Sequence, residues 1–364
     1  MAALSLLIFI PSLISSAYAG TCHPQLPSQL KNLVTFGDSY TDEGRLTYMF
    51  ANNLTLPPAG TLLPPSNTTA SGGLTWPRIV SNKSGLKSLN YAISSSSCSP
   101  DIVKRSAADF GSDFAADIPL EFPTIFEDQL PYYLADLRYP ELYVDGRNAE
   151  NTVYTVWVGG NDLGIGGFLN GFNEENTTLA SLVECNFAVL DEIYNTGGRQ
   201  FVVFGTHPLH VAPMYLPEEQ QPEPIENSSW PPISSYGLGD YNTKMREYAV
   251  STNTMLMFGI PYQRLEGRWP GATVSFFDAQ QLIVDIVTDP GRYVKEQPVA
   301  AGIEMFRKGC RDFAQLDCDF NEGPLGRYVW YDELHPSERV EEIIAEEFIK
   351  VLGGESKYGE SYPF

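Results

Sequence analysis

The sequence carries little positive charge. Its 364 residues include 23 lysines and arginines against 45 aspartates and glutamates, which gives a formal net charge of −22. Nucleic-acid binding requires a basic surface that neutralises phosphates, and this composition does not supply one. The excess of negative charge also disfavours anionic membranes and polyanionic substrates, and it suits a secreted protein kept soluble by self-repulsion. We therefore expect a neutral substrate and no nucleic-acid partner, and nothing implies an obligate protein partner.

Long apolar runs are also missing. The stretch Leu4–Ile14 is too short to cross a bilayer, and no later stretch is long and apolar enough for a membrane-spanning helix. Ala17-Tyr18-Ala19 follows it with the small-x-small pattern of a cleavage site, although no lysine or arginine precedes it. We predict a signal peptide at residues 1–19 and an extracellular protein. The alternative is a buried N-terminal helix.

Histidine and cysteine are scarce, with four and five residues, respectively. No Cys-x-x-Cys pattern occurs, and the only close histidine pair is His207 and His210. The spacing of these residues does not indicate a zinc site, and no metal is expected.

The cysteines nevertheless fit an oxidising compartment. Cys310 and Cys318 enclose a short polar loop, and a disulfide between them would brace the segment that follows. Cys22, Cys98 and Cys185 are odd in number, so one of them is expected to be unpaired. Cys98–Cys185 is our candidate for a second disulfide.

Five Asn-x-Ser/Thr sequons lie in polar or Ser/Thr/Pro-rich surroundings. Each sequon alone is common by chance, but together they fit passage through a glycosylating secretory pathway and predict surface loops. The predicted glycosylation sites are Asn53, Asn67, Asn82, Asn176 and Asn227.

Short β-branched and aromatic runs alternate with longer helical patterns. We predict strands at Leu33–Phe36, Ser88–Ile93, Thr152–Val158, Gln200–Thr206 and Thr273–Phe277, and helices at Phe126–Arg138, Thr178–Tyr194, Tyr241–Phe258 and Glu338–Leu352. Strands separated by helical crossovers indicate an α/β fold with a doubly wound, parallel sheet. The Pro- and Gly-rich stretches 56–73 and 217–232 are predicted loops rather than linkers, so residues 20–364 are predicted to form a single domain.

Two segments at opposite ends of the chain can supply a nucleophile and a base. Ser39 lies at the end of the first predicted strand, and Asp332 precedes His335 by three residues. A serine hydroxyl needs a base to remove its proton, and the base needs a group that orients it. The alternatives are an ordinary Gly-Asp-Ser turn, a surface histidine restricted by Pro336, and an aspartate that only caps its loop.

Two further strand ends carry polar groups, where sites of doubly wound sheets lie. Asn161 follows the third predicted strand, and its side-chain amide suits the stabilisation of an oxyanion. The alternative is an Asx-turn that closes the strand. The run Ser94–Ser97 follows the second strand and can offer a backbone N–H group, or it is a plain flexible loop.

Three blocks resemble, in order and spacing, those of the GDSL, or SGNH, hydrolases. They are Gly37-Asp38-Ser39-Tyr40, Gly159-Gly160-Asn161-Asp162 and Asp332-Glu333-Leu334-His335-Pro336. The resemblance covers almost the whole chain after residue 19. Other features look most like the fungal secreted acetylesterases of carbohydrate esterase family 16, namely Trp76-Pro77, Asn90-Tyr91-Ala92 and the late cysteine pair.

The resemblance implies a flavodoxin-like three-layer sandwich with a mostly parallel, five-stranded sheet. It implies Ser39 as nucleophile, His335 as base and Asp332 as the orienting acid. It also implies an oxyanion hole built from Ser39, Ser95 and Asn161. No metal or organic cofactor is implied.

Three further residues are expected to support the site, namely Asp38, Asp42 and Gly160, with Asp42 organising the nucleophile loop. One position departs from the family, because Ser95 occupies the place of a glycine whose N–H group points into the oxyanion hole. If the backbone there has positive φ, a serine costs about 1–3 kcal/mol of strain. The oxyanion hole is then weaker, or the Ser95 hydroxyl substitutes as a donor.

The function implied is that of a secreted serine esterase that removes acetyl groups from hemicellulose-derived sugars or oligosaccharides through an acyl-enzyme. One alternative is a lipase or phospholipase of the same superfamily that acts on longer acyl chains. A second alternative is a catalytically impaired relative that binds glycan, which the serine at position 95 would explain.

Overall fold

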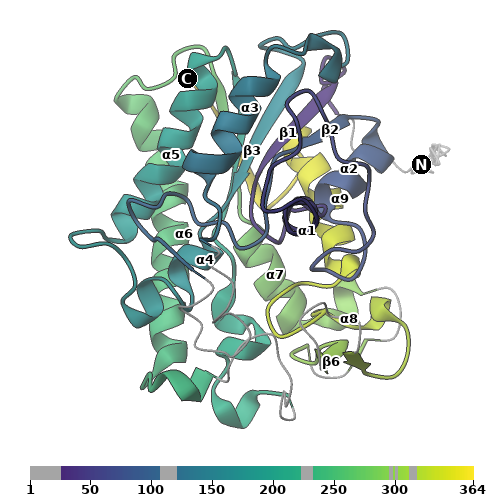
Figure 1. The fold of residues 1–364 in the computed structure, drawn as a ribbon, viewed down its shortest axis with the longest axis vertical. Coiled ribbons are helices and arrows are strands. Elements are labelled where there is room, and N and C mark those ends of the chain that lie inside the picture. Colours follow the sequence, from purple (N-terminus) through teal and green to yellow (C-terminus); the bar gives the residue numbers. More distant parts are fainter. Residues whose placement is uncertain (1–25, 107–120, 223–232, 295–297, 300–301, 311–317) are drawn as a thin grey trace, which may run out of the picture.

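A six-stranded sheet forms the centre of the protein, with helices on both of its faces (Figure 1). The structure is a computed structural model that describes residues 26–106, 121–222, 233–294, 298–299, 302–310 and 318–364. In spatial order, the strands are β2 (Lys87–Asn90), β1 (Asn32–Gly37), β3 (Thr152–Trp157), β4 (Gln200–Phe204), β5 (Thr273–Phe277) and β8 (Gly359–Pro363).

The first five of these strands are parallel, which confirms the predicted doubly wound α/β fold. Their order, 2-1-3-4-5, is that of flavodoxin-like sheets. The predicted number of five strands is wrong, because β8 adds an antiparallel edge next to β5. The prediction missed β8 because this short strand is polar, largely exposed and ends in a proline, as edge strands often do.

The central strands are buried on both faces, as a parallel sheet covered by two helical layers requires. Every residue of β1 and β3 is buried. The two strands pair in parallel, with Gly37 opposite Trp157 at their carboxyl ends. The loops that leave β1 and β3 therefore begin side by side at one edge of the sheet.

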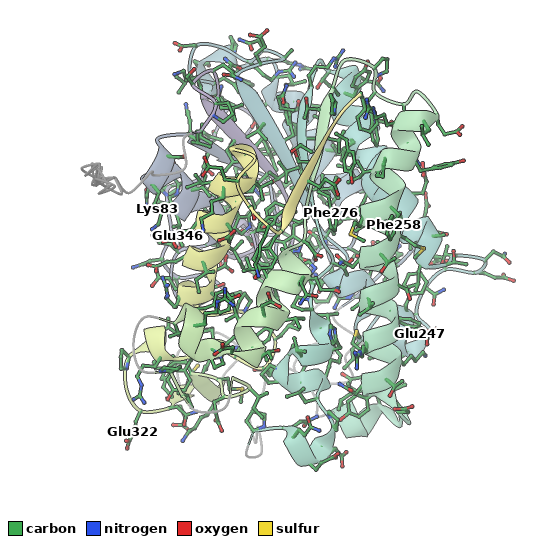
Figure 2. All side chains as sticks on the ribbon, turned by 180° about the vertical axis from the view of Figure 1, so that it is seen from behind. Lys83, Glu247, Phe258, Phe276, Glu322 and Glu346 are labelled. Carbon is green, nitrogen blue, oxygen red and sulfur yellow. A yellow bond between two sulfur atoms is a disulfide. The ribbon has the colours of Figure 1, made fainter. Side chains whose placement is uncertain are left out.

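Nine α-helices occur in the described residues. They are α1 (Arg45–Ala51), α2 (Trp76–Ser84), α3 (Leu130–Asp136), α4 (Gly160–Leu163), α5 (Leu179–Asn195), α6 (Tyr241–Leu265), α7 (Ala279–Thr288), α8 (Pro290–Tyr293) and α9 (Glu338–Leu352). Helices α2 and α9 pack together, and Lys83 and Glu346 form an ion pair of 2.9 Å between them (Figure 2). Helices α5 and α6 pack together on the other side of the sheet (Figure 1).

Helix α9 has the predicted bounds, and the Ser337 hydroxyl accepts a hydrogen bond from the Val340 N–H group as its N-cap. Two other helices differ from the prediction. Helix α6 continues beyond Phe258 and through Pro261, so the Gly and Pro signals there do not end it. The predicted helix Phe126–Arg138 instead starts as a π-helical turn over Ile125–Gln129 and continues as α3.

One predicted disulfide is confirmed, since Cys98 is bonded to Cys185 and ties the loop after β2 to α5. Cys318 is also disulfide-bonded, and its backbone pairs with that of Cys310 in an antiparallel hairpin of β6 (Arg307–Cys310) and β7 (Cys318–Phe320). The Cys310 side chain lies outside the described residues, as does Cys22.

The predicted signal peptide lies outside the described residues. Within the part of the chain that is described, no helix is long and apolar enough to cross a membrane. Four of the predicted sequon asparagines are exposed, and Asn227 lies outside the described residues. Asn82 lies in α2 rather than in a loop, whereas the other three exposed ones are Asn53, Asn67 and Asn176.

Candidate active site

Three side chains from opposite ends of the chain form one series of hydrogen bonds. The Nε2 atom of His335 lies 2.8 Å from the Oγ atom of Ser39. The Nδ1 atom of His335 lies 2.9 Å from Oδ2 and 3.0 Å from Oδ1 of Asp332. When Nδ1 carries the proton and donates it to the carboxylate, Nε2 is left free to accept the serine proton.

Ser39 lies in a tight turn directly after β1. The N–H groups of Thr41 and Asp42 both donate to the Asp38 carbonyl, at 2.9 Å each. Gly37 makes the turn possible, because a Cβ atom there would lie 2.7 Å from the Trp157 carbonyl oxygen of β3. The segment is thus an ordinary turn by its chemistry, and it also presents the hydroxyl to His335.

Asp332 caps its own loop and faces the base at the same time. Its Oδ1 atom accepts hydrogen bonds from the N–H groups of Leu334, at 2.9 Å, and His335, at 2.7 Å. Its Oδ2 atom accepts a hydrogen bond of 2.7 Å from Nη2 of Arg307. Burial alone would raise the pKa of Asp332, but the His335 ring and the Arg307 guanidinium outweigh it and hold the pKa at about 2. The Asp332 carboxylate is therefore ionised in the folded protein at moderately acidic and neutral pH.

The two segments predicted to form the oxyanion hole lie together. Asn161, in the first turn of α4, donates a hydrogen bond of 3.0 Å from Nδ2 to the Ser96 carbonyl. Ser95 has a φ of 68°, so the serine occupies the left-handed conformation that favours glycine. Within the described residues, the N–H groups of Ser39 and Ser95 donate no hydrogen bond.

Comparison with known proteins identifies the family. Residues 33–348 match the family described as GDSL-like Lipase/Acylhydrolase. The chain belongs to this family. It is similar to an acetylesterase of Hypocrea jecorina, with 37% identity over 97% of each chain. It is also similar to an acetylesterase of Thermothelomyces thermophilus, with 30% identity over 59% of this chain and 68% of the other.

Among solved structures, an acetyl xylan esterase from Geobacillus stearothermophilus is similar, with 13% identity and a TM-score of 0.38 over 90% of this chain and 98% of that one. As a member of the GDSL family that is 37% identical to an acetylesterase over 97% of its length, the protein is a carboxylic ester hydrolase.

In this GDSL hydrolase, Asp42 joins the nucleophile loop to the loop after β2. Its Oδ1 atom accepts hydrogen bonds from the N–H groups of Gly44, at 2.8 Å, and Arg45, at 2.6 Å. Its Oδ2 atom accepts from Ser94, both from the N–H group at 2.8 Å and from the hydroxyl at 2.9 Å. Asp42 therefore holds Ser94, the neighbour of Ser95, at a fixed position relative to the Ser39 loop.

A second buried Asp–His pair lies beneath the GDSL serine. The Nε2 atom of His207 lies 3.1 Å from Oδ1 of Asp38, and both side chains are almost fully buried. The His207 ring stacks on Trp157, with centroids 5.1 Å apart, and meets Tyr40 edge-on at 4.5 Å. A Cβ atom at Gly160 would lie 3.0 Å from the His207 ring, which explains the glycine next to Asn161.

Sequence reasoning considered His207 only as a member of a histidine pair and did not place it in the site. Its position carried a usable signal, because it follows β4 at the same sheet edge where Ser39 and Asn161 follow β1 and β3. Arg307 was missed as well, because its contact with Asp332 joins residues that lie 25 positions apart in the sequence.

A pocket opens in front of Ser39, and its walls are mostly apolar. The space between its walls is about 400 Å³, and this volume includes the open mouth of the pocket. Polar groups at its base include Asn161 and His207, while its apolar wall comprises Ile165, Leu209, Met214, Tyr215 and Leu334. The lining also includes the acidic Asp38 and the basic Arg105, which are both buried and whose formal charges cancel, so the pocket suits a neutral ester.

Proposed function

We propose that the protein is a secreted acetylesterase that acts on acetylated, neutral sugars or oligosaccharides derived from hemicellulose. The observation that carries the proposal is the hydrogen-bonded series Ser39–His335–Asp332. This series lies in a chain that is 37% identical to an acetylesterase over 97% of its length.

In the proposed acylation step, Ser39 Oγ bonds to the ester carbonyl carbon while its proton passes to His335 Nε2. Asp332 stabilises the imidazolium that forms. The carbonyl oxygen becomes an oxyanion, which accepts hydrogen bonds from the Asn161 amide and the N–H groups of Ser39 and Ser95. The bond to the sugar oxygen then breaks, and His335 gives its proton to the leaving alcohol.

In the proposed deacylation step, water replaces the sugar next to His335. The base takes a proton from the water as its oxygen bonds to the acyl carbon, and the same donors hold the second oxyanion. The bond to Ser39 Oγ breaks, the proton returns from His335 to the serine, and acetic acid leaves. The residues named are regenerated, and the cycle uses only ester and water.

Secretion of residues 20–364 as one domain belongs to the same proposal. The apolar leader, the Cys98–Cys185 disulfide and the four exposed sequon asparagines support it. N-terminal sequencing of the protein from culture medium is expected to begin after Ala19, and glycosidase treatment is expected to lower its apparent mass. A mature protein that keeps residues 1–19 and carries no glycan contradicts this part of the proposal.

The decisive experiment compares wild type and Ser39→Ala on acetylated xylo-oligosaccharides, with the released acetate and products mapped. Wild type is expected to release acetate, and the variant is expected to lose at least about 10³-fold in rate, as for removal of a catalytic nucleophile. Equal rates in the two proteins would refute the serine-nucleophile proposal.

Two controls separate the alternatives. Faster initial hydrolysis of p-nitrophenyl octanoate than of the acetate would favour a lipase, since the apolar pocket wall also suits a longer chain. A phosphonate is expected to label wild type but not Ser39→Ala. If wild type is not labelled but still binds xylan, the protein is instead a catalytically impaired glycan-binding relative.

A further inference from the structure

A buried arginine outside the three GDSL blocks contacts the acid of the Ser39–His335–Asp332 series. Arg307 is the first residue of β6, in the hairpin that precedes the Asp332 loop. Its Nη2 atom lies 2.7 Å from Asp332 Oδ2, and the two side chains are only 5% and 3% exposed. The same oxygen lies 2.9 Å from Nδ1 of His335. One carboxylate oxygen is thus shared between a permanent cation and the base.

The backbone around Arg307 fixes the guanidinium relative to the base. The Arg307 N–H group donates a hydrogen bond of 2.6 Å to the Tyr331 carbonyl, and the Phe306 N–H group donates one of 3.0 Å to the Trp330 carbonyl. The guanidinium also lies over the Tyr331 ring, 5.2 Å from its centroid. The Tyr331 N–H group in turn donates to the His335 carbonyl at 2.8 Å. These contacts therefore hold the start of β6 against the segment that carries the acid and the base.

The charges explain what this contact does. A buried carboxylate loses its hydration, and a neutral imidazole offers it a hydrogen bond but no compensating charge. Arg307 supplies a compensating charge that does not titrate in the working range of the enzyme. The same positive charge opposes a second positive charge on His335 and so disfavours uptake of a solvent proton by the base. The net charge of −22 has the opposite effect, because a negative molecule attracts protons. The charge of Arg307 counteracts this attraction at His335.

We propose that Arg307 is a positioning residue that acts through Asp332 and extends the activity of this esterase to acidic pH. The inference rests on the triad of the proposed function, with His335 as the base. Arg307 itself does not contact the pocket in front of Ser39.

Other titratable groups face the same cluster and are included in the test. Glu333 lies next to Asp332, and burial together with the Asp332 charge raises its pKa to about 7. Tyr331 packs on Arg307, and Tyr40 faces Asp332 from the nucleophile loop with Asp38 beside it. Burial raises the pKa of both tyrosines, so neither ionises at acidic pH. Glu333 is the group whose titration must be separated from that of the base.

The test is the pH profile of kcat/KM on p-nitrophenyl acetate for wild type, Arg307→Gln and Arg307→Lys. A matched control is Arg292→Gln, which removes the same charge from an exposed position of α8. In Arg307→Gln, the acid limb is expected to move upward by roughly one pH unit, the size of effect that a neighbouring charge has. Arg307→Lys is expected to keep most of the acidic activity, and Arg292→Gln to leave the limb in place. The same upward shift is expected when Arg307→Gln is combined with Glu333→Gln.

Equal losses in Arg307→Gln and Arg307→Lys at every pH, with an unmoved acid limb, would show that Arg307 has only a structural role and would overturn the inference.

A second measurement needs only the wild-type protein. If the buried Arg307 sets the acid limb, adding about 1 M NaCl leaves the limb in place, because salt screens buried pairs much less than surface charge. A downward shift of the limb in salt would assign it to the net surface charge instead. A wild type that does not hydrolyse p-nitrophenyl acetate at all would refute the proposed function as well, whereas an active wild type with an unmoved limb refutes only the role of Arg307.

Discussion

Tyr40 follows the GDSL serine directly, and its hydroxyl donates a hydrogen bond of 2.7 Å to the carbonyl of Leu334, the residue before His335. The nucleophile loop and the base loop are thus joined by a contact that bypasses the triad. Burial, followed by the charges of Asp38 and Asp332, raises the pKa of Tyr40 well above its ordinary value, so the hydroxyl stays protonated as a donor.

Replacement of Tyr40 by phenylalanine is the first test of this arrangement. The Tyr40→Phe variant leaves the Leu334 carbonyl without its partner, at a cost of about 1–2 kcal/mol in the free energy of unfolding. We expect kcat to fall about tenfold with KM little changed, because the loss affects the alignment of Ser39 and His335 rather than substrate binding. Chemical denaturation and steady-state kinetics measure the two effects. Tyr262→Phe, on an exposed part of α6, is the control, and equal behaviour of both variants contradicts the proposed role.

Position 95 tests the oxyanion hole. A residue with a Cβ atom in the left-handed region costs roughly 1–2 kcal/mol, so Ser95→Gly is expected to raise the thermal midpoint by about 1–3 °C without loss of kcat. Ser95→Ala keeps the strain and removes only the hydroxyl. If the backbone N–H group is the donor, Ser95→Ala retains the wild-type kcat. A loss of tenfold or more in Ser95→Ala would instead assign the donor to the hydroxyl.

Asn161 provides the second test of the oxyanion hole. Loss of one side-chain donor typically lowers kcat by about 10²–10³-fold, and we expect this for Asn161→Ala with a much smaller change in KM. The variant also loses the hydrogen bond to the Ser96 carbonyl, so its thermal midpoint is measured alongside. A variant with a lower midpoint but near-normal kcat would show that the Asn161 amide only holds the loop.

The dependence of stability on pH is expected to report on Glu341. This buried residue of α9 accepts hydrogen bonds from the Ser71 hydroxyl, at 2.8 Å, and the Trp76 N–H group, at 2.9 Å. Burial raises its pKa from 4.5 to about 8 in the folded protein. Since the folded state then holds a proton that the unfolded state releases, its contribution to stability is full below about pH 4.5 and is lost as the pH rises through 8.

Glu341→Gln cannot ionise, and its amide oxygen can still accept from the Trp76 N–H group while its NH2 group donates to the Ser71 hydroxyl. Its free energy of unfolding is therefore expected to fall less between pH 5 and about pH 8 than that of wild type, as measured by urea denaturation at a series of pH values. Glu355→Gln, at an exposed site, is the control and is expected to follow the wild-type curve. Parallel curves for wild type and Glu341→Gln would contradict the raised pKa.

The sequence predicted the parallel strands and the meeting of Ser39 with His335 because both follow from short patterns. A buried parallel strand is a continuous apolar run, and its carboxyl end is where a site of this fold lies. Asn161 was found by the same reasoning. His207 obeys it too, but nothing in the sequence near it suggests a partner, and its contact with Asp38 spans 169 residues.

Arg307 and β8 escaped prediction for a different reason. Their roles depend on tertiary contacts of short segments without a periodic apolar pattern. The β6 strand has four residues, and an arginine in a polar hairpin is ordinarily a surface residue. Only the return of the chain to the Asp332 loop buries it. The strain at Ser95 was expected conditionally from the family resemblance, and its φ of 68° became known only from the backbone.

Because Cys98 and Cys185 form a disulfide, the activity of the enzyme is expected to depend on the redox conditions of the compartment in which it folds. Cys98 lies three residues after Ser95, and its N–H group donates to the Asp162 carboxylate, beside Asn161, at 3.0 Å. A chain synthesised in a reducing cytosol can assemble its sheet but leaves this segment without its covalent anchor on α5. Recombinant production in the bacterial cytoplasm is therefore expected to give folded protein of low specific activity, and export to the periplasm is expected to restore it.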